Sequence, residues 1–368
     1  MKTLRILFGT MIIAISGCGG SNDPLETVNN YDQSVLLNNL GDNLILPAYR
    51  DLKNSAEKLE ITTDDFVSSP DLAALEMMRE ALKETRIAYQ WVTPYQFGPA
   101  EQFALNSELN LFPADKNQIE SNIASGTYDL SVLSNQDARG FQAVAYLIYG
   151  EMEDDTLLLE SFDEARLTYL KELVNRISFY AGQVESAWSP SGQNYLDDFK
   201  SRTGVDAGSS VGILVNSMNQ NFERNTRDGK IGIPIGIRTM GEPVPQNIEA
   251  RYAGYSTELL DANLLAYQYL YEGKARDGTD SEGFNDYLSQ IGALDASNQE
   301  LHEKISSQWN TIIAEADRFT DPLDNEIQNR QTELEDLFAE MQKMVVFMKT
   351  DLSSALGVVI SYQDNDGD

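Results

Sequence analysis

Residues 162–188 read FDEARLTYLKELVNRISFYAGQVESAW, and this stretch decides the fold class. Its apolar side chains recur at three- and four-residue steps: Phe162, Ala165, Tyr169, Leu173, Ile177, Tyr180, Val184 and Trp188. That spacing places them along one face of an α-helix. The stretch therefore predicts a long amphipathic helix that ends before Pro190.

The same helical periodicity runs through most of the chain. A helix capped by Ser69, with Pro70 in its first turn, is predicted to run towards Trp91. Another is predicted to begin near Asp321–Pro322 and to stop at Gly357. Similar patterns occupy residues 255–272 and 295–318. Because strand-like alternation is almost absent, we predict an all-α protein.

The chain also divides by composition. Residues 201–248 are rich in Gly, Ser and Asn and separate two sets of periodic segments. A chain of 368 residues is long enough for two domains of ordinary size. We therefore predict an N-terminal helical bundle over 31–200, an inter-domain loop region over 201–248 and a C-terminal helical bundle over 249–368.

The N-terminus has the pattern of an exported lipoprotein. Residues 1–17 combine two basic residues with an apolar run too short to cross a bilayer, which is typical of a signal peptide. Ile15-Ser16-Gly17-Cys18 resembles a bacterial lipobox, so Cys18 is predicted to carry lipid, with residues 18–30 as a tether. Gly19 after the cysteine favours the outer membrane over the inner one.

The charge balance limits the partners of the chain. It carries 58 acidic and 27 basic side chains, for a net charge of −31. Such a chain repels nucleic acid and anionic lipid headgroups. We therefore expect no nucleic-acid partner, and contact with the membrane only through the lipid on Cys18.

The sequence offers little for catalysis. His302 is the only histidine, and no Gly-x-Ser-x-Gly turn presents a nucleophilic serine. Haem would need an axial ligand, and none of the ten methionines lies in an attachment motif. Pairs of carboxylates are too numerous for the sequence to single one out.

Several short motifs occur together in an order that resembles one family. They are Trp91 with Phe97-Gly98-Pro99 and Asn106, then Arg139-Gly140-Phe141, Gly232-Ile233-Pro234, the segment from Lys349 to Gly357, and the acidic ending from Ser361 to Asp368. In this order they are similar to imelysin-like proteins, of the iron-regulated protein A-like lipoprotein kind. The resemblance implies two helical bundles related by duplication, a site at their junction, and a link to iron acquisition.

The family's hallmark, Gly-x-His-x-x-Glu, is degenerate in this chain. The glycine corresponds to Gly140, but Gln142 stands at the histidine position and Ala145 at the glutamate position. A neutral amide is a weak ligand and alanine is none, so the resemblance implies a site that has lost its metal-binding groups. Peptidase activity is accordingly disfavoured.

We therefore predict a non-catalytic binding protein of the bacterial cell envelope with a site at the domain junction. Its ligand is a small molecule, a metal complex or a partner protein of iron uptake, and iron is the candidate cofactor although no intact metal motif is present. The alternative is a metal-dependent hydrolase or direct iron-binding protein that uses carboxylates elsewhere, such as those around Asp351 or Glu249. The candidate site residues are Trp91, Phe97, Arg139, Gly140, Gln142, Ala145, Lys349 and Asp351.

Overall fold

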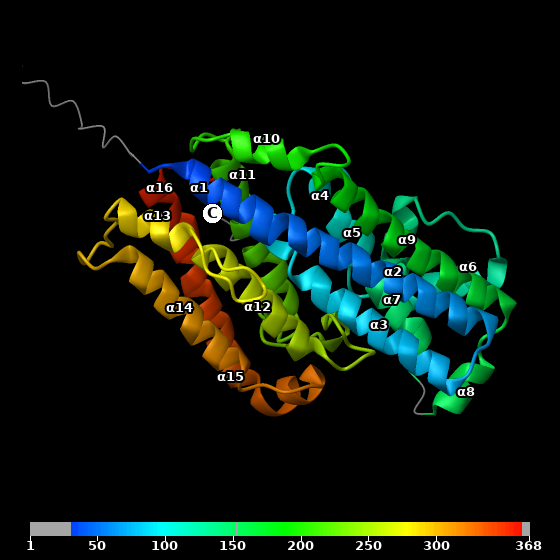
Figure 1. Ribbon diagram of the computed structural model, residues 1–368. Helices are drawn as coiled ribbons and strands as arrows, with labels where there is room; N and C mark the ends of the chain where they lie inside the picture. Colours follow the sequence, from blue (N-terminus) through cyan, green and yellow to red (C-terminus); the bar gives the residue numbers. More distant parts are fainter. Residues whose placement is uncertain (1–30, 152–153, 363–368) are drawn as a thin grey trace, which may run out of the picture. The chain divides into compact units, whose positions relative to one another are not determined.

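The computed structural model describes residues 31–151 and 154–362, which fold into helices joined by loops (Figure 1). Across these residues there is no strand, and a single bridge pairs Leu294 with Glu300. The prediction of an all-α protein is confirmed. No described helix combines the length and the apolarity needed to cross a membrane. The signal peptide, Cys18, the tether and the acidic ending beyond residue 362 lie outside the described residues.

The helices follow one another in short and long segments. The α-helices are α1 Gln33–Asn39, α2 Leu46–Ser68, α3 Leu72–Gln90, α4 Pro99–Gln102, α5 Leu105–Leu109, α6 Lys116–Ser125, α7 Gly140–Tyr149, α8 Asp155–Glu160, α9 Glu164–Trp188, α10 Tyr195–Ser201, α11 Ser210–Asn221, α12 Ser256–Glu272, α13 Phe284–Gln290, α14 Leu301–Ala316, α15 Leu323–Val346 and α16 Ser353–Leu356. Three segments are π-helical: η1 Leu40–Ile45, η4 Phe222–Gly232 and η6 Phe347–Leu352. Three are 3₁₀-helical: η2 Thr93–Tyr95, η3 Leu133–Ala138 and η5 Pro245–Asn247.

The long predicted helices are present. Helix α9 ends at Trp188, before Pro190, and the last helical run ends at Gly357, whose φ of +76° suits a glycine C-cap. The prediction that Ser69 caps α3 was wrong. Helix α2 continues to Ser68, so Ser69 terminates it, and the Asp71 side chain instead accepts a hydrogen bond from the Ala74 amide at 2.8 Å.

The first half of the chain packs around α2, which lies alongside α3 and α9 (Figure 1). Where α9 ends, Trp188 is fully buried among other rings. Phe97 packs edge-on against Trp188 at 5.7 Å between ring centroids and stacks on Phe199 at 5.9 Å. With 3 % of its surface exposed, Phe97 belongs to the hydrophobic core.

In the second half of the chain, α14 packs against α12 and α15, and α15 packs against η4 (Figure 1). The halves meet where α3 contacts α12. One cluster of buried apolar side chains includes members of all three predicted segments, among them Leu36, Val215 and Leu337. The division into two domains remains a prediction.

The prediction of loops throughout residues 201–248 was wrong. This region contains α11 and the 11-residue π-helix η4. Several of its glycines make room for neighbouring atoms. A Cβ on Gly212 would lie 2.1 Å from the Asp206 carbonyl oxygen, and one on Gly232 would lie 2.6 Å from the Phe338 ring. The high glycine content had suggested loops, but several of these glycines instead allow close packing.

Candidate functional site

A buried carboxylate, Glu249, lies where separate segments of the chain meet. Its side chain accepts hydrogen bonds from Gln90 Nε2 on α3 at 3.0 Å and from Asn110 Nδ2, just beyond α5, at 2.7 Å. Lys230 Nζ, from η4, binds the second carboxylate oxygen. Only 2 % of Glu249 is exposed. The carboxylate therefore joins three distant parts of the sequence inside the protein.

Burial and charge act in opposite directions on this pair. Burial raises the pKa of Glu249, but the charges of Lys230 and Arg86 and the hydrogen bonds outweigh it, so the pKa lies below its usual value. Burial lowers the pKa of Lys230, and the nearby carboxylate opposes that shift only in part. Glu249 is thus ionised at neutral pH, and its buried negative charge is stabilised by Lys230 and Arg86.

Gln142, at the histidine position of the family motif, connects α7 to the Glu249 segment. Its Nε2 donates to the Ile248 carbonyl oxygen at 3.3 Å, and its Oε1 accepts from Arg86 Nη1 at 3.5 Å. Arg86 is fully buried and also donates to the backbone carbonyl of Glu249. Gln142 therefore makes structural hydrogen bonds on both sides of its amide.

These residues do not fit a metal ion. Ala145 is fully buried and has no donor atom, and the Gln142 oxygen faces a guanidinium. A cation bound to Glu249 would compete with Lys230 and meet the charge of Arg86. In the part of the chain that the structure describes, no group of three or more His, Cys, Asp or Glu side chains could hold a metal.

Gly140 permits the close approach that brings Asn110 into this cluster. Its φ is +78°, and a Cβ at this position would lie 2.6 Å from the Leu109 carbonyl oxygen. Only glycine combines that backbone conformation with that contact without strain. The glycine of the degenerate motif thus keeps a packing role at the start of α7.

Arg139 turns to a different carboxylate. Its Nη2 donates to Glu108 Oε1 at 2.8 Å and its Nη1 to the Leu130 carbonyl oxygen at 2.5 Å. Arg176 binds the other Glu108 oxygen at 2.7 Å. Burial lowers the pKa of Arg139, and Glu108 opposes that shift. Arg139 thereby links the loop before α7 to α5 directly, and to α9 through Glu108.

A cavity of about 180 Å³ adjoins the Glu249 cluster. Asn263 joins the two, since it donates to Gln90 Oε1 at 3.2 Å and to Thr93 Oγ1 at 2.8 Å. The charged residues of its lining are Arg224 and Lys230. Amide side chains dominate the rest of the polar lining: Gln96, Asn106, Asn110, Asn221, Asn225, Asn247 and Asn263. Among the residues that the structure describes, no carboxylate lines the cavity. We call this space the amide-lined cavity.

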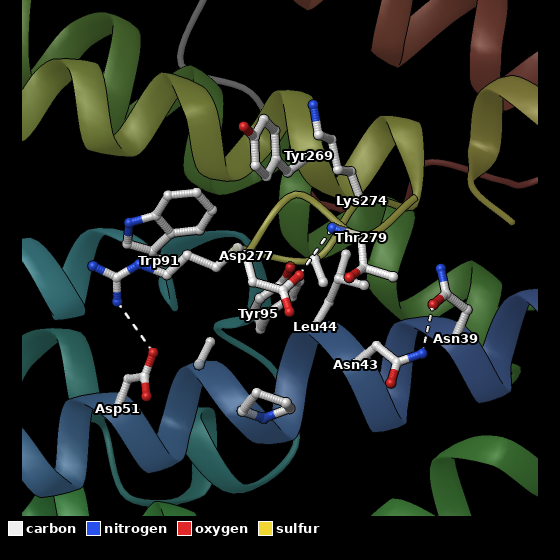
Figure 2. A pocket seen from close by; sticks show the side chains of 14 residues that line it. Asn39, Asn43, Leu44, Asp51, Trp91, Tyr95, Tyr269, Lys274, Asp277 and Thr279 are labelled. Carbon is white, nitrogen blue, oxygen red and sulfur yellow. Dashed lines mark hydrogen bonds and ion pairs between the residues drawn. The ribbon is translucent and has the colours of Figure 1, made fainter. Parts of the chain in front are cut away.

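Trp91 lines a separate pocket of about 510 Å³ (Figure 2). Its ring packs edge-on against Tyr269 of α12 at 5.5 Å between centroids. Figure 2 shows both rings facing the helical segment that carries Asn43 and Asp51. The structure therefore places Trp91 in a pocket whose lining does not include Gln142.

Lys349 and Asp351 lie together on η6. Lys349 Nζ is 3.6 Å from Glu223 Oε2, which also accepts a hydrogen bond from the Tyr362 hydroxyl at 3.0 Å. Asp351 is partly exposed; burial raises its pKa, and Asp295 adds to the shift. The eight predicted site residues are thus distributed over several places, with only Gly140, Gln142 and Ala145 on α7 beside the Glu249 cluster.

Arg86, Gln90, Asn110 and Lys230 were not predicted from the sequence. One signal was present. Leu75, Met78 and Leu82 form the apolar face of α3, and one further turn along this face is Arg86. A charged residue on a buried face needs a buried partner. No comparable signal identifies Lys230, because its partner lies in another segment.

The Lys230–Glu249 pair can be tested by a double-mutant cycle. We expect Lys230→Met and Glu249→Gln each to lower the free energy of unfolding by about 3–5 kcal/mol, because each leaves one buried group without its partner. The double variant should lose less than the sum of the two. Urea denaturation measures all four proteins; additive losses would contradict a direct pair.

The pH dependence of the same variants gives a second readout. Because the folded-state pKa of Glu249 is depressed, its stabilising contribution is complete above the unfolded value of 4.5 and is lost as pH falls through the folded value. The stability advantage of the wild type over Glu249→Gln should therefore shrink below about pH 4.5. An advantage that grows on acidification would contradict the depressed pKa.

Comparison with known proteins agrees with this architecture. The imelysin family model, also described as Peptidase M75, matches residues 45–343. No curated protein sequence matches the chain significantly. Among solved structures, a protein described as an iron-regulated protein A precursor from Parabacteroides distasonis ATCC 8503 aligns with a TM-score of 0.72 and 18 % identity, over 88 % of this chain and 95 % of that one. An imelysin-like protein from Psychrobacter arcticum 273-4 aligns with a TM-score of 0.68 and 16 % identity, over 90 % of this chain and 97 % of that one. Because the family model covers most of its length, this chain belongs to the imelysin family.

Proposed function

We propose that the chain is a lipid-anchored, non-catalytic binding protein of the bacterial cell envelope that serves iron acquisition. The proposal that the protein is non-catalytic rests on the ion pair between Lys230 and Glu249. A buried carboxylate beside the degenerate motif would be the natural metal ligand or general base. Here its oxygens accept from Lys230, Gln90 and Asn110, so it is fully engaged within the protein.

The amide-lined cavity is the proposed ligand site. Amide groups offer both donors and acceptors, and Glu249 neutralises the charge of Lys230. Asn110 is 9 % exposed and uses its nitrogen for Glu249, which leaves its oxygen for a ligand. This lining suits a small molecule with several hydrogen-bonding groups. Its volume corresponds to about six water molecules.

The link to iron rests on relatives. One solved relative is described as iron-regulated, and the sequence motifs resemble lipoproteins of that kind. We propose that the ligand or a partner protein connects this chain to iron uptake without direct metal coordination. The lipidated Cys18 would hold the protein at a membrane, with the outer membrane favoured by Gly19.

Metal analysis tests the proposed function directly. After incubation with Fe²⁺, Fe³⁺ or Zn²⁺ and desalting, we expect purified protein to retain less than one equivalent of any of them, because Lys230 and Arg86 oppose a cation at Glu249. Elemental mass spectrometry measures the content. Stoichiometric metal that is lost in the Glu249→Gln variant would contradict the proposal.

Anchoring has its own test. We expect Cys18→Ser to abolish incorporation of labelled palmitate and to move the protein from the membrane fraction to the soluble fraction, because lipid is the proposed membrane contact. Expression in a bacterial host followed by fractionation gives the readout. Ser16→Ala, which keeps the cysteine, is the matched control. A Cys18→Ser protein that remains with the membrane would contradict lipid anchoring.

A further inference from the structure

The pocket that contains Trp91 has a lining unlike that of the amide-lined cavity. Three aromatic side chains, Trp91, Tyr95 and Tyr269, share it with two carboxylates, Asp51 and Asp277 (Figure 2). Its volume of about 510 Å³ exceeds that of the amide-lined cavity. Aromatic faces and carboxylates together favour organic cations.

Two cationic side chains of the protein, Arg276 and Lys274, already contact these aromatic rings. The Arg276 guanidinium lies 5.1 Å from the centroid of the Trp91 ring, and its Nη1 is 3.2 Å from Asp51 Oδ2. Lys274 Nζ lies 4.7 Å from the centroid of the Tyr269 ring. Each exposed ring face is therefore paired with a cation from the loop that follows α12. Arg276 shows directly that the Trp91–Asp51 position accepts a guanidinium.

The Arg276–Asp51 pair is exposed to solvent. The Arg276 side chain is 43 % exposed and that of Asp51 is 50 % exposed. Exposed ion pairs and exposed cation–π contacts contribute little, because water solvates both partners well. A ligand whose guanidinium took this position, and which also reached other groups of the pocket, could replace Arg276 without disturbing the core.

Two further polar groups of the lining are available. Tyr95 is buried, with 3 % of its surface exposed, and Asp277 is exposed to solvent. Asp277 accepts from the Thr279 amide at 2.9 Å and makes no ion pair with any residue that the structure describes. When Arg276 leaves, the charged groups of the lining are Asp51, Asp277 and Lys274, so the pocket becomes net negative. The net charge of −31 further concentrates cations around the chain.

We propose that this pocket binds the guanidinium group of an arginine-containing ligand, and that Arg276 is an internal competitor for the same position. The ligand guanidinium lies on Trp91 against Asp51, and the remainder of the ligand reaches Tyr95 and Asp277. This site is independent of the amide-lined cavity, so neither proposal depends on the other.

The test uses Nα-acetyl-L-arginine amide as the probe. Trp91 is the only one of the three tryptophans that is not fully buried, so a ligand on its ring should change the emission of the wild-type protein. Isothermal titration calorimetry gives the affinity in all variants. We expect saturable binding to the wild type and about two- to fivefold tighter binding to Arg276→Ala, because the competitor is removed. Trp91→Leu and Asp51→Asn should weaken binding.

Two controls make the outcome decisive. Nα-acetyl-L-citrulline amide has the same shape without the charge, and Arg318→Ala removes an exposed arginine paired with Glu315 elsewhere. We expect weaker binding of the citrulline probe and an unchanged affinity in Arg318→Ala. The proposal is overturned if Arg276→Ala binds no tighter than the wild type, if both probes bind equally, or if Trp91→Leu binds as well as the wild type. Circular dichroism verifies that each variant is folded.

Discussion

The ion pair between Lys230 and Glu249 is the interaction on which the centre of this protein depends. Both side chains are buried, and a lone charge in that position would cost several kcal/mol. The pair is tolerated because Gln90, Asn110 and Arg86 bind the remaining acceptors of Glu249. Those partners come from α3 and from the segment after α5. The hydrogen bonds and the ion pair of Glu249 therefore determine how η4 packs against the first half of the chain.

This constraint also determines the chemistry of the site. The ammonium of Lys230 binds Glu249 Oε2, one of the two carboxylate oxygens that could ligate a metal ion. At the position of the family's histidine, Gln142 bonds to Arg86 and to the Ile248 carbonyl, so it helps to position the same segment. Cationic side chains also pair with carboxylates elsewhere: Arg139 forms an ion pair with Glu108, and Arg276 forms one with Asp51. In each of these pairs a cation of the chain neutralises a carboxylate.

The sequence predicted the helices well because their periodicity is local. The stripe that ends at Trp188 needs only its own residues to be recognised, and α9 has the predicted end. Predictions failed where a distant neighbour decides the structure. Gly232 is a glycine because the Phe338 ring lies against it, and this contact is invisible in the segment around η4. Likewise, the family motif identified Gln142 and Ala145, but the partners that give Gln142 its role, Arg86 and Ile248, are far away in sequence.

The candidate residues separate for a similar reason. Phe97 and Arg139 carry the kind of side chain that also serves a ligand site, and only their neighbours, Trp188 and Glu108, assign them to packing and to an internal ion pair. Trp91, six residues before Phe97, lies partly exposed in the aromatic pocket. Neighbours in sequence thus serve different purposes, and the arrangement of the helices decides which.

An internal ammonium, and not a metal ion, neutralises Glu249. Anomalous diffraction from crystals soaked in Zn²⁺ or Fe²⁺, with data collected at the absorption edge of each metal, tests this assignment. We expect no anomalous peak within coordination distance of Glu249 or Gln142, and Lys230 Nζ against the carboxylate. A peak between Glu249 and Gln142 with Lys230 displaced would contradict it.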